Sequence, residues 1–179
     1  MGIFDFFKPK KTSSKPSTTT VKSSQQKSAN TLTVKVVGTE YRDQTQILSL
    51  GTLNSDYKLD KQNLIKKYHG DTIQYEYNFP AYKATFEFEP TNEYDPNAIK
   101  VLIQGIHVGY VKKGSCARIR NLINQNKILD ISAEIRGGKS KNLYSTCGIG
   151  EKPTSKDYVL ERNSDEFRIT LTLKLFETQ

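Results

Sequence analysis

From residue 31 onward, hydrophobic and polar residues alternate with a period of two over several short stretches. In the first stretch, Leu32, Val34 and Val36 alternate with Thr and Lys until Gly38 interrupts the pattern. Such alternation is typical of half-buried β-strands, because successive side chains of a strand point to opposite faces. Gly105 lies between two alternating stretches, which predicts a tight turn and a β-hairpin. The further predicted strands cover residues 85–89, 99–103, 106–111, 131–135 and 168–176.

Apolar residues follow helical spacing at two places between these strands. Asp60 can cap a helix over residues 61–69 that ends at Gly70, and Ser115 can cap a helix over residues 116–126. Each helix places its aliphatic side chains on one face, as packing against a core requires. The pattern therefore predicts a mainly β fold, a small antiparallel OB-like barrel with two packed helices.

The first 30 residues differ in composition from the rest of the chain. Residues 9–30 are almost wholly Lys, Ser, Thr, Gln and Pro, and Val21 is their single branched aliphatic residue. Such a segment buries too little apolar surface to offset the entropy of ordering. We predict a disordered tail over residues 1–30 and one domain over residues 31–179. Phe4, Phe6 and Phe7 near the start could contact a membrane surface or a partner groove, or dock nowhere.

Positive charge is concentrated in one internal segment. The net charge is +8, and residues 100–141 carry nine basic and two acidic residues, whereas residues 31–99 are net acidic. A local concentration favours a polyanionic partner more strongly than a basic total does, and it predicts a surface that follows phosphates. The alternative is scattered, solvated charge, as for most Lys and Arg residues. The residues concerned are Lys100, Lys112, Lys113, Arg118, Arg120, Lys139 and Lys141.

The sequence assembles no convincing active site. It contains neither a GxGxxG nor a GxSxG motif, and the GGKS stretch at residues 137–140 lacks the spacing of a P-loop, so a hairpin turn is predicted there. The acidic residues between positions 87 and 95 follow no metal-ligand spacing. We therefore expect a protein that is not an enzyme and that uses no cofactor, metal ion or small-molecule substrate.

The two cysteines, Cys116 and Cys147, form no CxxC pair, and neither histidine lies near them in sequence, so no zinc site is predicted. Cys116 near a helix start could have a lowered thiol pKa, although a buried, unreactive thiol is the commoner outcome. Neither a secretory signal nor a span of transmembrane length is evident. We expect a cytoplasmic protein with two free thiols, and a Cys116–Cys147 disulfide is the alternative.

The stretch EPTNEYDPNAIKV, residues 89–101, is unusually rich in turn-forming residues. Asp95-Pro96-Asn97 suits a type I turn, and Asn92 can brace the backbone with its side-chain amide. Turn chemistry does not explain Tyr94, a large ring in the middle of a polar loop. An aromatic face can stack on an unpaired base, and the adjacent carboxylate can accept a hydrogen bond from a sugar hydroxyl while disfavouring phosphate. These properties suit a site for a strand end.

EPTNEYDPNAIKV, together with HVGYVKKGSCARIRNLI at residues 107–123, resembles the HIRAN domain. The resemblance covers roughly residues 32–176, and residues 89–123 are its specific part. It implies a modified OB-like barrel that binds the 3′ end of single-stranded DNA, a role in DNA repair, and a helicase or nuclease as a partner. For this chain it implies that Tyr41 and Tyr94 hold the terminal bases, that Asn92 and Asp95 contact the 3′ hydroxyl, and that Lys112 or Lys113 contacts phosphate.

Two features depart from the family pattern. Glu40 precedes the first of these tyrosines, where helicase members often carry a basic residue, and an acid there would repel phosphate. Residues 43–84 form an insertion for which the family suggests no role. Arg118, from the basic segment, completes the set of predicted binding residues.

Two classes of function remain open. The first is a non-catalytic module that binds single-stranded DNA, at its 3′ end, through the Tyr94–Asp95 turn and a basic surface; DNA and RNA are not distinguished. The second is a protein-interaction module of a larger DNA-processing or membrane-tethered complex. The two differ in salt dependence, because binding to phosphates weakens steeply as salt is added.

Overall fold

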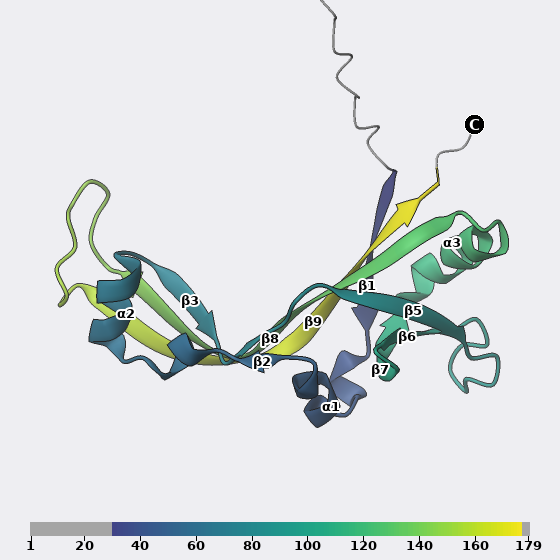
Figure 1. The fold of residues 1–179 in the computed structure, drawn as a ribbon, viewed down its shortest axis with the longest axis horizontal. Coiled ribbons are helices and arrows are strands. Elements are labelled where there is room, and N and C mark those ends of the chain that lie inside the picture. Colours follow the sequence, from purple (N-terminus) through teal and green to yellow (C-terminus); the bar gives the residue numbers. More distant parts are fainter. Residues whose placement is uncertain (1–29, 177–179) are drawn as a thin grey trace, which may run out of the picture.

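The computed structural model describes residues 30–176. The Phe-rich start and the predicted disordered tail, except for its last residue, lie outside these residues. The described chain forms a barrel from which a long arm extends, with the helix α3 beside the barrel and the helix α2 on the arm (Figure 1). The elements that build the barrel and the arm follow from different parts of the sequence.

Six antiparallel strands close the barrel in the order β8-β5-β6-β7-β1-β9, and β9 pairs back onto β8. The inward positions are the apolar residues of the period-two pattern, so Ile99, Val101 and Ile103 of one strand are all fully buried. This architecture confirms the predicted mainly β, OB-like barrel. The strands are β1 (Thr31–Val37), β5 (Tyr82–Phe88), β6 (Ile99–Ile103), β7 (Ile106–Val111), β8 (Ile128–Ser145) and β9 (Tyr158–Leu175).

The predicted hairpin at Gly105 is confirmed, since β6 and β7 pair antiparallel on either side of it. Gln104 and Gly105 both have positive φ, at 52° and 81°. Two consecutive positive φ values are what a two-residue type I′ turn requires, and this turn matches the twist of the strands it joins. The register places Ile103 opposite Ile106.

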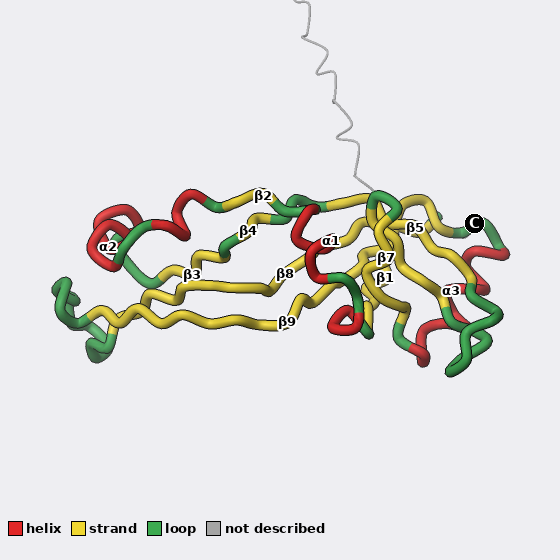
Figure 2. Tube along the Cα trace, turned by 90° about the horizontal axis from the view of Figure 1, so that it is seen from below, coloured by secondary structure: helices red, strands yellow, loops and turns green. Residues whose placement is uncertain are grey.

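The arm is the outer half of the β8–β9 ribbon, where residues 138–145 pair with residues 158–165 (Figure 2). The strand β3 (Thr72–Tyr75) pairs with β8 along this outer half. The helix α2 (Lys61–Tyr68) packs on the ribbon and not on the barrel: its Leu64 contacts Leu143 and Tyr158 in a small core of their own. The arm therefore has its own apolar cluster, separate from that of the barrel.

The predicted hairpin turn at residues 137–140 is wrong, because β8 runs through them with a register shift between Arg136 and Gly138. Gly137 has φ 120°, and a Cβ atom on it would lie 2.3 Å from the carbonyl oxygen of Glu166. The two glycines therefore let one strand bend and lie close to its partner, as at a β-bulge, instead of reversing the chain.

The helix α3 (Lys113–Asn124) packs against the barrel and contributes Cys116 and Ile119 to its core. The predicted N-cap at Ser115 is wrong. The helix begins at Lys113, and the Ser115 amide donates to the Lys112 carbonyl, 2.7 Å away, within the first turn. The local pattern did not reveal this earlier start because Lys112 makes no side-chain cap.

The predicted cap of α2 is confirmed, since an Asp60 carboxylate oxygen accepts from the Asn63 amide at 2.8 Å. The helix ends with His69 in the left-handed conformation, one residue before the predicted stop. Besides β3, five short elements of the described chain were not predicted. They are η1 (Thr39–Tyr41), α1 (Gln44–Ser49), β2 (Thr52–Leu53), η2 (Ser55–Lys58) and β4 (Tyr77–Asn78).

The insertion at residues 43–84 has two structural roles. Its first part is α1, whose Ile47, followed by Leu50, enters the barrel core. Its later part supplies α2 and β3 to the arm. Between residues 30 and 176, no helix is both long and apolar enough to cross a membrane.

Candidate nucleic-acid interface

The loop between β5 and β6 is held by its own side chains. Asn92 Oδ1 accepts from the backbone amides of Tyr94 and Asp95, both at 3.0 Å. Asp95 Oδ1 accepts from the Asn97 amide at 2.8 Å, and the Ala98 amide donates to the Asp95 carbonyl at 2.8 Å. The predicted turn and the predicted bracing by Asn92 are both confirmed.

Glu89 ties this loop to the barrel. Its carboxylate lies 2.8 Å from Lys100 Nζ, and it accepts from Asn92 Nδ2 at 2.7 Å and from the Tyr110 hydroxyl at 2.9 Å. These bonds, the one from Lys100 first, lower the pKa of Glu89 to about 2. The ionised carboxylate thus joins the loop to both β6 and β7 at neutral pH.

A second set of contacts surrounds the ring of Tyr110. Arg42 Cζ lies 5.5 Å from the ring centroid, and the His107 ring packs edge-on at 4.8 Å. Burial, and then the charge of Arg42, lower the pKa of His107, which is therefore neutral at pH 7. His107 Nε2 lies 3.0 Å from the Gly109 carbonyl, so Nε2 donates there and Nδ1 accepts from Arg42 Nη1 at 3.4 Å.

A groove of about 350 Å³ lies between the loop, α3 and the paired ends of β1 and β7. Tyr94 stands at this groove with its side chain 91% exposed. Asp95 and Lys113 contribute one negative and one positive group, while Val37 and Tyr110 contribute apolar surface. The groove therefore combines an exposed ring, an apolar wall and two opposite charges.

A second groove, of about 400 Å³, shares Asp95 and Lys113 with the first and continues along α3. Lys113, Arg120 and Asn124 line it because residues seven and eleven positions apart return to the same side of a helix. Arg120 also lies over Phe88, with Cζ 4.3 Å from the ring centroid. The two grooves together form a surface with Asp95 at its centre.

The structure brings four of the predicted residues together. They are Asn92, Tyr94, Asp95 and Lys113, which all line the first groove. The other three are exposed and line neither groove: Tyr41 on η1, Lys112 at the N-cap of α3, and Arg118 on a side of α3 that faces away.

The predicted binding residues did not include Tyr110 or Arg42, and Arg120 was named only as part of the basic segment. Tyr110 could have been found within the VGY motif, and Arg120 follows Lys113 at a spacing of seven residues, which places it on the same face of a helix. Arg42 had no such signal, because its contact with Tyr110 joins residues far apart in sequence.

Three of the seven basic residues that the sequence singled out are engaged away from the grooves. Lys100 pairs with Glu87 and Glu89, and Lys139 lies 3.9 Å from Glu76 on the arm. Lys141 is buried and donates to the Leu59 carbonyl at 3.0 Å. The other four, Lys112, Lys113, Arg118 and Arg120, all lie on α3 or at its start, and of these Lys113 and Arg120 line the grooves.

Cys116 lies at the wall shared by the two grooves. It is buried, and burial raises the pKa of its thiol, which favours the unreactive interpretation over that of a nucleophile. Cys147 lies just beyond the end of β8, and both cysteines are free thiols in the structure. Among the described residues, no cluster of three or more His, Cys, Asp or Glu side chains could hold a metal ion.

Comparisons with known proteins bear on the class of domain. The sequence model of the HIRAN domain matches residues 29–152. Among solved structures, the crystal structure of the HIRAN domain of human HLTF is similar over 81% of this chain and 77% of that chain, with 17% identity and a TM-score of 0.32. The curated proteins contain no match. The match to the family model spans β1 to β8, with the loop at residues 89–98 and α3, but not β9, and it supports a DNA-binding module at the level of the family. The chain belongs to the HIRAN domain family.

Proposed function

We propose that this protein binds single-stranded DNA with the 3′-terminal nucleotide in the groove beside Tyr94. The observation that carries the proposal is the 91% exposure of the Tyr94 side chain on a backbone held by Asn92. A large ring that stacks on no aromatic or cationic side chain of residues 30–176, and that an ordered turn presents, loses little further freedom when a base stacks on it.

The charges of the groove favour a strand end over the interior of a strand. Asp95 uses Oδ1 to hold its own turn, so Oδ2 is the oxygen that accepts a hydrogen bond from a terminal sugar hydroxyl. A terminal phosphate would bring two negative groups together in place of that bond. Lys113, at the start of α3, lies at the same groove and is placed to contact the preceding phosphate.

The proposed role is non-catalytic. Binding requires only stacking, one hydrogen bond and phosphate contacts. The thiol at the groove, that of Cys116, is buried, and burial raises its pKa. The absence of strand cleavage, with and without divalent cations, would agree with this role, and cleavage would contradict it.

The test is a fluorescence polarisation titration of strands of about 10 nucleotides, a length within the range that OB folds bind. Strands with a 3′ hydroxyl are compared with strands that carry a 3′ phosphate, at several salt concentrations. The hydroxyl strand is expected to bind more tightly at every salt concentration. Equal affinities would remove end recognition, and no binding at low salt would remove the proposal.

Two variants separate the contributions of the ring and the carboxylate. Tyr94→Ala should weaken binding by about 1–3 kcal/mol, and Tyr94→Phe should retain most of it, because stacking needs only the ring. Asp95→Asn retains an acceptor oxygen for the Asn97 amide, so the turn persists while the charge is lost. The expected result is a smaller preference for the hydroxyl over the phosphate end, with the melting temperature unchanged.

A further inference from the structure

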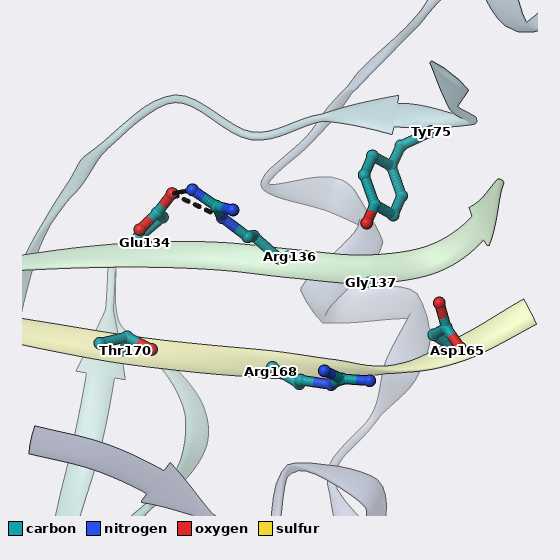
Figure 3. A pocket seen from close by; sticks show the side chains of 7 residues that line it. All are labelled: Tyr75, Glu134, Arg136, Gly137, Asp165, Arg168 and Thr170. Carbon is teal, nitrogen blue, oxygen red and sulfur yellow. Dashed lines mark hydrogen bonds and ion pairs between the residues drawn. The ribbon is translucent and has the colours of Figure 1, made fainter. Parts of the chain in front are cut away.

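A cleft of about 400 Å³ lies where the arm leaves the barrel, outside both grooves (Figure 3). Its floor is the outward face of the β8–β9 ribbon, next to the bulge at Gly137. Tyr75 of β3 overhangs this floor, with its hydroxyl directed toward the strands. The insertion, which supplies Tyr75, thus completes a cleft that the barrel strands alone would leave open.

Two arginines lie side by side in this cleft. Arg136 and Arg168 are directly opposite each other in the antiparallel ribbon. Like charges at such a position repel each other and destabilise the strand pair. Arg136 is balanced by Glu134, whose carboxylate lies 2.5 Å from Arg136 Nη2. Arg168 is exposed, and it forms no ion pair with any residue that the structure describes.

The other side chains of the cleft suit a nucleotide better than a free anion. The cleft contains two carboxylates, those of Glu134 and Asp165. Asp165, with the hydroxyls of Tyr75 and Thr170, provides hydrogen-bond acceptors for base amino groups or sugar hydroxyls. The two carboxylates balance the two guanidinium groups, so the cleft as a whole is not strongly basic. Its ligand must therefore present both phosphate oxygens and hydrogen-bond donors.

The turn η1 contacts one strand of the cleft and one strand of the groove beside Tyr94, here called the strand-end groove. This turn packs against β9 and against β7. β9 carries Arg168, and β7 carries Tyr110, which lines the strand-end groove. Tyr41, 79% exposed, is the last residue of η1. A strand that occupied both sites would have to pass along this exposed turn.

We propose that the Arg136–Arg168 cleft binds a backbone phosphate and its nucleotide in the interior of the same single strand whose 3′ end occupies the Tyr94 groove. The inference rests on the proposed function for the path of the strand. It assigns the insertion at residues 43–84 a role, because Tyr75 covers the cleft. The guanidinium groups of the two arginines bind the two non-bridging oxygens of the phosphate, and Tyr75 contacts the sugar or the base.

The experiment compares a short strand of about 4 nucleotides with a long strand of about 12, both within the range bound by OB folds. Arg168→Gln and the double variant Arg136→Gln/Arg168→Gln are titrated with each strand across salt. Affinity for the long strand should fall roughly tenfold per arginine, and the slope of log K against log salt should decrease by about 0.7 for each lost phosphate contact. Affinity for the short strand should stay within about twofold of wild type.

Arg162→Gln is the matched control, since Arg162 is an exposed arginine of the same strand that does not line the cleft. Arg168→Lys should keep the wild-type salt slope, because the positive charge remains, while losing part of the bidentate affinity. Unchanged long-strand affinity in the double variant, or equal losses for both strands, would overturn the proposal. The same result for Arg162→Gln as for Arg168→Gln would also overturn it.

Failure of this proposal is distinguishable from failure of strand-end binding. Each long strand is made with a 3′ hydroxyl and with a 3′ phosphate. Suppose that strands with either end bind equally while the arginine variants still bind the long strand more weakly. That result would contradict end recognition and support the proposal for the cleft. Suppose instead that the double variant keeps both the preference for the 3′ hydroxyl and the wild-type affinity for the long strand. That result would contradict the proposal for the cleft and support end recognition.

Discussion

Glu89→Gln tests whether one carboxylate holds the binding loop on the barrel. The wild-type carboxylate receives three hydrogen bonds, from Lys100, Asn92 and Tyr110. Glutamine has nearly the same shape as glutamate. Its amide replaces one of the two carboxylate oxygens with an NH2 donor, and it carries no negative charge to pair with the Lys100 ammonium group. Because a hydrogen bond to a charged group contributes about 1.5–3 kcal/mol, we expect the free energy of unfolding to fall by about 2 kcal/mol at pH 7.

The pH dependence of this difference follows from the pKa of Glu89, which folding lowers from its ordinary value of 4.5 to about 2. A group whose pKa is lower in the folded state stabilises the fold above its unfolded pKa, and this contribution is lost as the pH falls toward the folded value. The difference between wild type and Glu89→Gln should therefore be constant from pH 7 to pH 5 and should shrink from about pH 4.5 toward pH 2.

The assay is thermal unfolding followed by circular dichroism at a series of pH values, in which 2 kcal/mol corresponds to a shift of about 4–8 °C. Glu87→Gln is the matched control, since Glu87 faces the same Lys100 at 3.4 Å but is 55% exposed. That exposed pair should contribute at most about 1 kcal/mol. Equal stability of Glu89→Gln and wild type at pH 7, or a difference that persists at pH 2, would refute the reasoning.

Three further predictions concern the barrel, the thiols and the arm. Gly109→Ala should lower the melting temperature strongly, because its Cβ atom would lie 2.6 Å from the Val37 carbonyl oxygen at a φ of 145°, whereas Gly105→Ala, which meets nothing within 4 Å, should cost only about 1 kcal/mol. Iodoacetamide should label Cys147 much faster than Cys116 in the native protein, because burial raises the pKa of the Cys116 thiol; equal rates, measured by mass spectrometry, would contradict its burial. Leu64→Ala should destabilise the arm by about 2–5 kcal/mol and leave the barrel amides protected in hydrogen exchange; loss of protection in β6 would show that the arm and barrel unfold together.

The sequence by itself determined the elements whose signals are local. The alternation of Leu32, Val34 and Val36 and the glycine turn at Gly105 predicted β1 and the β6–β7 hairpin, because a half-buried strand needs apolar residues on one face. Turn chemistry predicted the bracing by Asn92, and the exposed ring of Tyr94 could be singled out because no turn requires it. These parts depend on interactions between residues that are close along the chain.

Tertiary structure alone decided the arm and the composition of the site. Gly137 and Gly138 indicate a turn by their local chemistry, yet β8 continues through them because β9, some 20–30 residues away in sequence, supplies the hydrogen-bond partners. The same long-range pairing sets Arg136 opposite Arg168, and the packing of α3 directs Arg120 toward the groove while Arg118 faces away. Such placements depend on free energies of contact between distant segments, which no local pattern of residues records.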